Sequence, residues 1–482
     1  MVDFRPIGYV IGLLVAALGV TMIFPLMIDY AAGNGHLPVF MQSAIITVTF
    51  GGLLALACAN GVTDRMTIQQ TFILTTGVWV VLPIFGAIPF LIGATGAPYV
   101  DAFFEAMSGL TTTGSTVFSG LEELPRGLLF WRALLQWFGG IGIIVVAMVF
   151  LPELRVGGMQ IFRSEGFDTI GKILPRATEI ASRISVIYFG LTIAAAITYI
   201  GFGMTPFDAV THAMTTLATG GFANYDSSFA GFGAGIEYAA VVFMLLAALP
   251  FVRFVQLMSG NARPLLADSQ IRMFLLIAAT LIVLMALWQF NTAAASPETS
   301  FRKSLFNVVS IITGTGYSSA NYMNWGAFPV AAFFFIGLVG GCAGSTSCSI
   351  KIFRYQLLFS SIKAQVRRIH SPHGLFSTRY AGRRVTDDVL SSVMAFFVLF
   401  IVSLGLIAVL LAMTGLDFIT SISGAAAALA NVGPGLGPTI GPAGNFASLN
   451  DTAKWILAAA MLIGRLELMA VYVLFTLKFW RG

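Results

Sequence analysis

The chain has 482 residues, of which 57% are hydrophobic and 10% are charged, and its formal net charge is +5. Soluble domains carry about 25% charged residues, so this composition excludes an ordinary soluble protein and indicates many membrane-spanning helices. The charge is small and forms no basic patch interleaved with aromatic residues, which argues against a nucleic-acid partner.

Ten apolar stretches have about the 20-residue length that crosses a bilayer as an α-helix. They are 6–28, 40–60, 71–94, 128–151, 182–203, 236–258, 273–290, 326–352, 389–413 and 453–478. The first is longer than the apolar region of a signal peptide and lacks a clear small-residue cleavage pattern. We therefore expect it to be a retained membrane helix.

A short semi-apolar insertion that ends in a glycine turn recurs four times between two longer apolar stretches. The turns lie at 111–115, 218–222, 312–318 and 430–434. Internal repetition of this kind predicts four similar units, at 69–178, 179–270, 271–386 and 387–482, after a two-helix extension at 1–68. The predicted fold is an all-α polytopic membrane protein with ten transmembrane helices and four helix–pore-loop–helix repeats in pseudo-fourfold symmetry.

The register of the repeats follows from two methionines. Met107 and Met214 each lie seven residues before a glycine, Gly114 and Gly221. This spacing makes Gly221, rather than the neighbouring Gly220, the equivalent of Gly114. The aligned glycines of the third and fourth repeats are Gly316 and Gly433.

Lysine and arginine are distributed unevenly along the chain. If the N-terminus is cytoplasmic, 20 of the 26 lie on the inner side and five on the outer side, and Arg465 lies within the membrane. Cytoplasmic loops are enriched in these residues. We therefore expect both termini and the loops 153–181 and 353–388 to be cytoplasmic, with the four turns toward the outer face.

Acidic residues gather on that outer side, where two interpretations are open. They could form a negative vestibule that concentrates cations, or they could cap the short helices. We expect capping by three residues that open the insertions, Asp101, Asp208 and Asp417.

Four glycine turns at membrane depth predict a site made of main-chain carbonyls. Such carbonyls can replace the water of a monovalent cation without fixed charge. Irregular backbone at this depth is tolerated only where it lines a cavity or is buried in protein. The short helices would direct the negative ends of their dipoles at a common axis. Four unrelated helix kinks are the alternative interpretation.

Four segments resemble the filter segments of the Trk/Ktr/HKT superfamily of potassium transporters. They are Thr113-Gly114-Ser115, Gly220-Gly221-Phe222, Thr315-Gly316-Tyr317 and Val432-Gly433-Pro434-Gly435. The resemblance covers essentially the whole chain, and the two N-terminal helices match the bacterial TrkH/TrkG branch. In plant relatives, serine at the first filter glycine accompanies sodium transport, so Gly114 implies potassium.

The resemblance also implies which residues bind K+. These filter residues are Thr112, Thr113, Gly114 and Ser115, then Thr219, Gly220, Gly221 and Phe222, then Gly314, Thr315, Gly316 and Tyr317, and finally Asn431, Val432, Gly433 and Pro434.

Small and polar residues at 337–349 interrupt the eighth apolar stretch. From the residues alone, this segment is either a close helix-packing face or a mobile break. It resembles the intramembrane gating loop of the family, although Cys348-Ser349 stands where many relatives carry a glycine pair. The gating residues that the resemblance implies in this loop are Gly340, Gly341, Gly344, Ser345 and Thr346.

Arg465 lies near the middle of the last apolar stretch. A cation there costs on the order of 3 kcal/mol by insertion scales, so it should face water or a partner. Glu467 is two residues away and points elsewhere on a helix. Arg465 therefore faces the pore or pairs with another repeat, and it resembles the family's pore arginine, a barrier to cations. The cysteines Cys58, Cys342 and Cys348 are interpreted as packing residues.

The resemblance implies potassium uptake across the bacterial inner membrane by a homodimer, as a channel or a symporter. A cytosolic TrkA-type subunit would bind the regulatory nucleotide, and this chain would bind none. The basic loop 353–386 is either a docking surface for that subunit or an anchor to anionic membrane lipid.

Two other classes of function are less well supported. An enzyme is disfavoured because the histidines are scattered and no Gly-Lys-Ser/Thr motif follows a strand. A secondary carrier for a small organic solute is the alternative, but such folds usually contain inverted repeats. Here all four repeats start on the same side.

Overall fold

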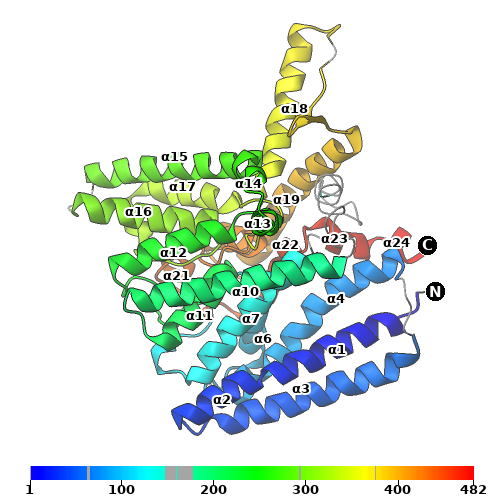
Figure 1. Ribbon diagram of the computed structural model, residues 1–482, viewed down its shortest axis with the longest axis vertical. Helices are drawn as coiled ribbons and strands as arrows, with labels where there is room; N and C mark the ends of the chain where they lie inside the picture. Colours follow the sequence, from blue (N-terminus) through cyan, green and yellow to red (C-terminus); the bar gives the residue numbers. More distant parts are fainter. Residues whose placement is uncertain are drawn as a thin grey trace.

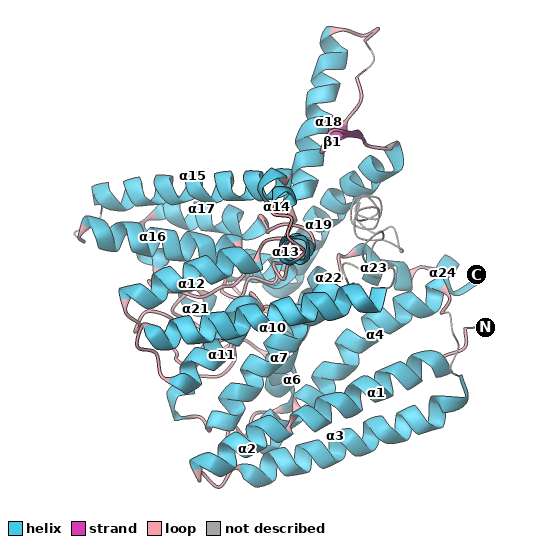
Figure 2. Cartoon of the chain, in the orientation of Figure 1, coloured by secondary structure: helices cyan, strands magenta, loops and turns pink. Residues whose placement is uncertain are grey.

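The computed structural model of the chain describes residues 2–61, 66–146, 159, 177–292, 295–374 and 376–481. These residues form a helical bundle from which α18 (Ile352–His370) projects (Figures 1 and 2). Within them, the only named strands are β1 (Arg379–Tyr380) and β2 (Arg383–Arg384), which pair as an antiparallel hairpin. The expected cytoplasmic loop 153–181 lies mostly outside the described residues.

The N-terminal extension is a pair of closely packed helices. After α1 (Arg5–Thr21) and α2 (Ile23–Ala32), the chain returns along them as α3 (Leu37–Cys58) (Figure 1). A Cβ added to Gly12 would lie only 2.6 Å from the backbone nitrogen of Ala55. Glycine therefore lets the two backbones approach, as is common between membrane helices.

Seven helical segments of the described chain are long and apolar enough to cross a membrane. Two bent pairs also satisfy this criterion if each is one span: α12 (Ala234–Ala247) with α13 (Phe251–Met258), and α22 (Asp451–Arg465) with Met469–Phe475. The described residues thus contain seven spans, or nine with both pairs. The all-α membrane fold is confirmed, whereas the number ten stays a prediction.

Three of the predicted spans contain breaks that have local causes. The chain bends by 91° between α12 and α13, where Pro250 precedes the second helix. It bends by 107° after α22, where Glu467 and Leu468 have φ values of 63° and 50°. In the predicted eighth span, α17 (Ala327–Leu338) ends where the small and polar residues begin. Hydropathy alone does not reveal the bends after α12 and α22, because the residues around them remain apolar, whereas the break after α17 lies in the segment where the sequence indicates an interruption.

Four short helices correspond to the predicted insertions. They are α6 (Tyr99–Leu110), α11 (Pro206–Leu217), α16 (Pro297–Ile312) and α20 (Phe418–Ala430). Each is followed by an irregular turn and a further helix, so the polypeptide enters the bundle, turns and leaves again. Most residues in the second half of each helix are buried, which places the four C-terminal ends inside the protein.

The expected aspartate caps are only partly correct. Asp417 caps α20 and accepts a hydrogen bond from the Thr420 amide at 3.1 Å. The cap of α11 is Thr205, whose hydroxyl also donates to Asp208 in the first turn. Asp101 lies in the first turn of α6 and forms an ion pair with Lys454 instead. The sequence could not distinguish these roles, since all three aspartates lie within three residues of a helix start.

The remaining helices complete the bundle around this interior. They are η1 (Ala59–Gly61), α4 (Ile68–Gly86), α5 (Ile88–Ile92), η2 (Leu121–Glu123), α7 (Arg126–Val145), α10 (Ala177–Gly201), α14 (Arg263–Ala267), α15 (Ser269–Thr292), η4 (Tyr322–Trp325), α19 (Asp387–Met413), α21 (Gly437–Ile440), α23 (Met469–Tyr472), η5 (Val473–Phe475) and α24 (Leu477–Arg481). Both ends of the chain lie at the same end of the bundle (Figure 1).

Candidate functional site

All four short helices end in the same backbone motif. Just beyond each helix, one residue has a left-handed φ, and the next amide bonds to the carbonyl five residues earlier. The left-handed residues are Thr112 (51°), Thr219 (49°), Gly314 (76°) and Asn431 (51°). The bonds run from Thr113 to Ser108, Gly220 to Thr215, Thr315 to Ser310 and Val432 to Ala427, at 2.9–3.0 Å. This Schellman motif satisfies carbonyls at the helix end. It gives the backbone the same direction after each of the four short helices.

The four turns meet in a closed ring. A Cβ added to the aligned glycine of any turn would overlap a carbonyl oxygen of the following turn. Gly114 would meet Gly220, Gly221 would meet Thr315, Gly316 would meet Val432, and Gly433 would meet Thr113. Each carbonyl belongs to the residue just before the aligned glycine of its own turn. The ring thus presents equivalent carbonyls from the four repeats in chain order.

Only glycine fits the aligned positions of this ring. Their φ values are 86° at Gly114, 77° at Gly221, 82° at Gly316 and 98° at Gly433, all in the region that L-residues rarely adopt. A side chain there would also occupy the place of a neighbouring carbonyl. In the second repeat, Gly221 occupies this position and Gly220 supplies the carbonyl, which is the register expected from the methionine spacing.

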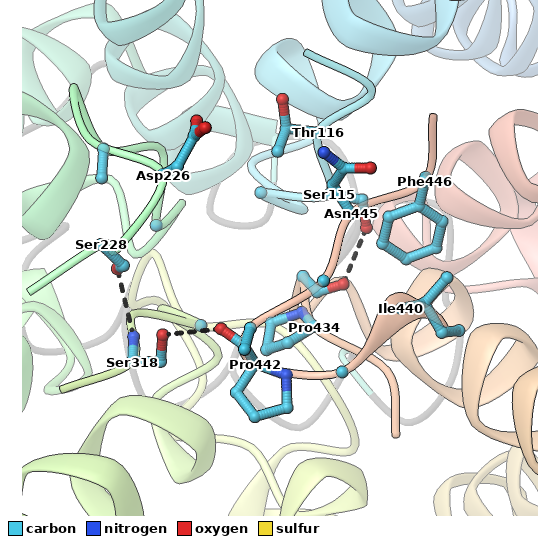
Figure 3. A pocket seen from close by; sticks show the side chains of 18 of the residues that line it. Ser115, Thr116, Asp226, Ser228, Ser318, Pro434, Ile440, Pro442, Asn445 and Phe446 are labelled. Atoms are coloured by element: carbon cyan, nitrogen blue, oxygen red, sulfur yellow. Dashed lines mark hydrogen bonds between the residues drawn. The ribbon is translucent and has the colours of Figure 1, made fainter. Parts of the chain in front are cut away.

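A cavity of about 440 Å³, here called the outer cavity, lies against one side of the ring. All four aligned glycines contribute to its lining, and side chains from the four repeats surround its open centre (Figure 3). Hydrogen bonds between repeats hold its wall, including Ser115 Oγ to the Gly433 carbonyl at 2.8 Å and Ser318 Oγ to the Pro442 carbonyl at 3.0 Å. A hydrated cation could therefore reach the ring from this side.

The outer cavity is not lined by the cluster of acidic residues that a negative vestibule requires. Its charged lining residues in the described chain are Asp226 and Arg132. Other outer carboxylates are neutralised in ion pairs, such as Glu105 with Arg132 at 2.8 Å and Glu237 with Lys303 at 2.7 Å. Sequence position could not reveal these partners, because they lie in other helices.

On the other side of the ring, residues 339–351 form an irregular loop instead of a helix. Its backbone is anchored to the end of α12, where the Cys342 amide bonds to the Ala248 carbonyl at 3.0 Å and Thr346 Oγ1 bonds to the Ala247 carbonyl at 3.0 Å. The Ser349 amide bonds to the Ala430 carbonyl at the end of α20, also at 3.0 Å. The break before Pro250 leaves carbonyls of α12 available to hold this loop.

The loop lies directly beneath the turns. Cys348 Sγ is 3.7 Å from Thr112 Oγ1 of the first turn. The backbone nitrogen of Cys348 would lie 3.4 Å from a Cβ added to Gly314 of the third turn. Beneath the ring, a cavity lined by Cys348 and Arg465 has a volume of about 20 Å³, which is room for about one water molecule. The loop thus fills the space that continues the outer cavity inward.

Arg465 holds this loop from the fourth repeat. It is the last residue of α22 and is 3% exposed. Its guanidinium donates to the Gly139 carbonyl of α7 at 3.0 Å and contacts Cys348 Sγ and the Thr346 carbonyl of the loop. The expected alternative, an ion pair with another repeat, is absent among the described residues. Instead, Glu467 forms an ion pair with Arg354 of α18.

The sequence analysis missed the polar residues that support the turns. Arg132 on α7 is buried, donates to the Ala223 carbonyl at 2.8 Å, and lies 4.2 Å from the centre of the Phe222 ring. Gln136, one helical turn along the same helix, hydrogen bonds to the second turn. Polar residues in a membrane helix are costly. Two of them four residues apart in an apolar helix were the signal that could have identified this face.

Comparison with known proteins agrees with this architecture. Residues 36–481 match the TrkH family, which is described as a cation transport protein. The chain belongs to the TrkH family. It is similar to the Trk system potassium uptake protein TrkI of Halomonas elongata, with 42% identity over 99% of this chain and 97% of the relative. It is also similar to TrkH of Escherichia coli, with 36% identity over 99% of each chain.

A solved structure extends the TrkH similarity to three dimensions. The crystal structure of the potassium transporter TrkH from Vibrio parahaemolyticus superposes with a TM-score of 0.91 at 34% identity, covering 100% of both chains. The family inferred from the glycine turns is therefore confirmed, and so is the helical membrane fold.

Proposed function

We propose that this TrkH-family chain takes up potassium through a central pathway, with the ring of four turns as its selectivity filter. The observation that carries this proposal is the closed ring of equivalent carbonyls. Carbonyl oxygens can replace the hydration shell of K+ and release the ion quickly, because they carry no full charge. The similar TrkI and TrkH proteins are named as potassium uptake proteins. Gly114, rather than serine, in the first turn favours K+ as the cargo.

The K+-binding residues in this proposal are the four turns themselves. They are 112–115, 219–222, 314–317 and 431–434. The repeats that carry them are 69–178, 179–270, 271–386 and 387–482, after the extension 1–68. In each turn, the aligned glycine and the residue two positions before it have left-handed φ values, so all four turns have the same backbone conformation. This similarity favours one ligand shell shared by the four turns over the alternative of four unrelated helix kinks.

The gate in this proposal is the loop 337–349 together with Arg465. The loop lies against the inner ends of the first and third turns, and Arg465 places a positive charge beside it. Conduction requires the backbone of Gly340, Gly341, Gly344, Ser345 and Thr346 to move away from the axis. The hydrogen bonds that oppose this movement join the loop to Ala247, Ala248, Phe251, Gln270, Ala430 and Arg465.

We place the chain in the bacterial inner membrane as a homodimer, with both termini cytoplasmic. α18 projects from the bundle (Figure 1), and an apolar stripe along it is exposed at spacings that share one helix face. The stripe consists of Phe359 (57% exposed), Ile362 (50%), Val366 (48%) and Ile369 (72%). A second copy of the chain could cover this stripe, since a protruding helix is most easily stabilised by an equivalent helix in a symmetric dimer.

A cytosolic TrkA-type subunit is the proposed regulator and would bind the nucleotide that this chain does not. The similar proteins are components of a Trk system by name. Arg367 and Arg368 near the end of α18 offer positive charge for docking within the loop 353–386. Attraction to anionic membrane lipid is the other use of the same charges.

The test of the pathway is flux of K+ or Rb+ into proteoliposomes that contain the purified chain. Gly316→Ser should abolish most of the flux, because its side chain would displace the Val432 carbonyl from the ring. Gly405→Ser is the matched control, since Gly405 lies in α19 and a Cβ added there would meet no atom within 4 Å. Undiminished flux through Gly316→Ser, or no flux through the intact chain, would contradict the proposal.

The same preparation separates the remaining mechanisms. A channel gives a reversal potential set by K+ alone, whereas a symporter shifts it with the proton or sodium gradient. A secondary carrier for a small organic solute would show uptake that depends on the solute and is insensitive to Gly316→Ser. The common orientation of the four repeats disfavours that carrier, since inverted repeats are typical of the class.

A further inference from the structure

The first and third turns contain a pair of threonines that the second turn lacks. Thr111 Oγ1 and Thr113 Oγ1 are 2.7 Å apart behind the first turn, and Thr313 Oγ1 and Thr315 Oγ1 are 2.8 Å apart behind the third. The second turn has Ala218 and Gly220 at the equivalent positions. The second turn therefore has no side chain of its own in the space behind the ring carbonyl.

Gln136 occupies the place of the missing side chain. It is fully buried and comes from α7, which belongs to the first repeat. A Cβ added to Gly220 would overlap the side-chain amide of Gln136. The space that Thr113 and Thr315 fill within their own repeats is thus filled here from a neighbouring repeat.

The amide of Gln136 bonds to the second turn on both sides of Gly221. Its nitrogen donates to the Gly220 carbonyl at 2.6 Å, and its oxygen accepts from the Phe222 amide at 3.0 Å. The Phe222 amide can only donate, so the amide oxygen must face it and the NH₂ group must face Gly220. The two bonds fix the orientation of the peptide groups that flank Gly221.

The Gly220 carbonyl is the second repeat's contribution to the ring. Within the described residues, the ring carbonyls of Thr113, Thr315 and Val432 accept no hydrogen bond, so this carbonyl is held differently from the others. A carbonyl oxygen has two lone pairs, and one remains for an ion after Gln136 has bound the other. Its direction toward the axis then depends on a residue outside the turn.

We propose that Gln136 is a positioning residue for ion selectivity, whose amide replaces the threonine absent from the second turn and sets the direction of the Gly220 carbonyl. The inference rests on the proposed filter function. Arg132, four residues earlier on the same face of α7, supports it by holding the Ala223 carbonyl, three residues after Gly220.

The test compares K+ and Na+ flux through full-length variants in proteoliposomes. Gln136→Ala should lower the preference for K+ over Na+ by about tenfold, since the loss of both hydrogen bonds frees the carbonyl to reorient. Gln289→Ala is the matched control, because Gln289 is also a buried glutamine on a membrane-spanning helix, α15, and no hydrogen bond in the described structure joins it to the turns. This control should keep the wild-type preference.

A second substitution tests the replacement directly. Gly220→Thr alone should impair flux, because the new side chain collides with Gln136. In Gln136→Ala the space is vacant, and φ of Gly220 lies outside the left-handed region, so threonine is permitted there. The double variant Gln136→Ala/Gly220→Thr should therefore recover the flux that Gly220→Thr lacks, but not the K+ preference, because the threonine hydroxyls of the other turns bond to each other and not to a ring carbonyl. A merely structural role for Gln136 would change the amount of folded protein and leave the ion ratio unaltered.

Each outcome bears on the inference. An unchanged K+ preference in Gln136→Ala, or no recovery of flux in the double variant, overturns it. If Gln136→Ala does not fold, Gln136→Glu takes its place, since a carboxylate can accept from Phe222 but cannot donate to Gly220. A wild-type preference in Gln136→Glu would then overturn the inference. Absence of K+ flux in the unmodified chain would refute the filter itself, which is a different result from altered selectivity.

Discussion

The guanidinium of Arg465 connects two parts of the site through main-chain carbonyls. It reaches Gly139 of α7 in one direction and Thr346 of the loop in the other. No carboxylate pairs with it in the described structure, so in the proposed pathway its positive charge would repel a cation that has passed the ring. A buried, uncompensated charge acts strongly in a medium of low dielectric constant.

Removal of this charge should open the pathway at the level of one residue. Arg465→Gln is expected to raise Rb+ uptake without a regulatory partner by about tenfold, because both the electrostatic barrier and a contact with the loop are lost. Uptake into proteoliposomes measures the effect. Arg465→Lys keeps the charge and should remain near the wild-type rate. Equal uptake by wild type and a folded Arg465→Gln variant would argue against a gating role.

At the scale of elements, the four short helices must each keep their C-terminal ends at the ring. Three of their N-terminal ends have different side-chain caps, which are Thr205 in α11, Ser296 in α16 and Asp417 in α20, whereas α6 begins after Pro98 without one. The hydrogen bonds from Thr420 hold the pKa of Asp417 below its ordinary value. The folded protein therefore prefers the ionised carboxylate at this position.

Acid should remove the stabilisation that Asp417 provides. A carboxylate whose pKa is lowered on folding stabilises the protein above its unfolded pKa, here about 3.8, and this contribution is lost as pH falls through the folded pKa. Asp417→Ala should lower the free energy of unfolding by about 1 kcal/mol at neutral pH and by less at pH 3. Thermal unfolding in detergent at both pH values measures this. Asp417→Asn keeps a capping side chain and should show little dependence on pH; a strong dependence would contradict the assignment.

The repeated backbone motif explains why the elements of the site could be predicted from sequence. Glycines at a repeated spacing after short apolar helices were sufficient to locate the four turns and to choose Gly221 over Gly220. The spacing of Met107 and Met214 carried that choice, because each methionine lies three residues before the end of its short helix. Local pattern and local structure coincide in these segments.

The parts that sequence could not provide depend on contacts between repeats. Gln136 is 84 residues from the Gly220 carbonyl that it holds, and Lys454 is 353 residues from Asp101. A hydropathy profile also does not indicate the bends after α12 and α22. Glu467 was correctly separated from Arg465, yet its partner Arg354 became evident only when α18 was placed beside the end of α22.

At the scale of the whole molecule, the exposed stripe on α18 predicts the oligomeric state. Ile362→Asp should weaken the proposed homodimer, because a charge would enter an apolar interface and lose its hydration. Light scattering of the detergent-solubilised protein should then show a larger monomer fraction than in wild type. Lys363→Asp, on the same helix outside the stripe, serves as a charged control. A dimer of unchanged stability in Ile362→Asp would place the interface elsewhere.

Contacts between the first and fourth turns complete the ring, so the ring can form only late in synthesis of the chain. Ser115 bonds to the Gly433 carbonyl, and Asn431 bonds to Thr113, each across 318 positions of the chain. A nascent polypeptide that has inserted only its first three repeats lacks the fourth carbonyl of the ring. If the ring is the proposed filter, such a polypeptide cannot discriminate between ions until the final quarter has been synthesised. On that proposal, selective uptake of K+ begins only when translation of the chain is nearly finished.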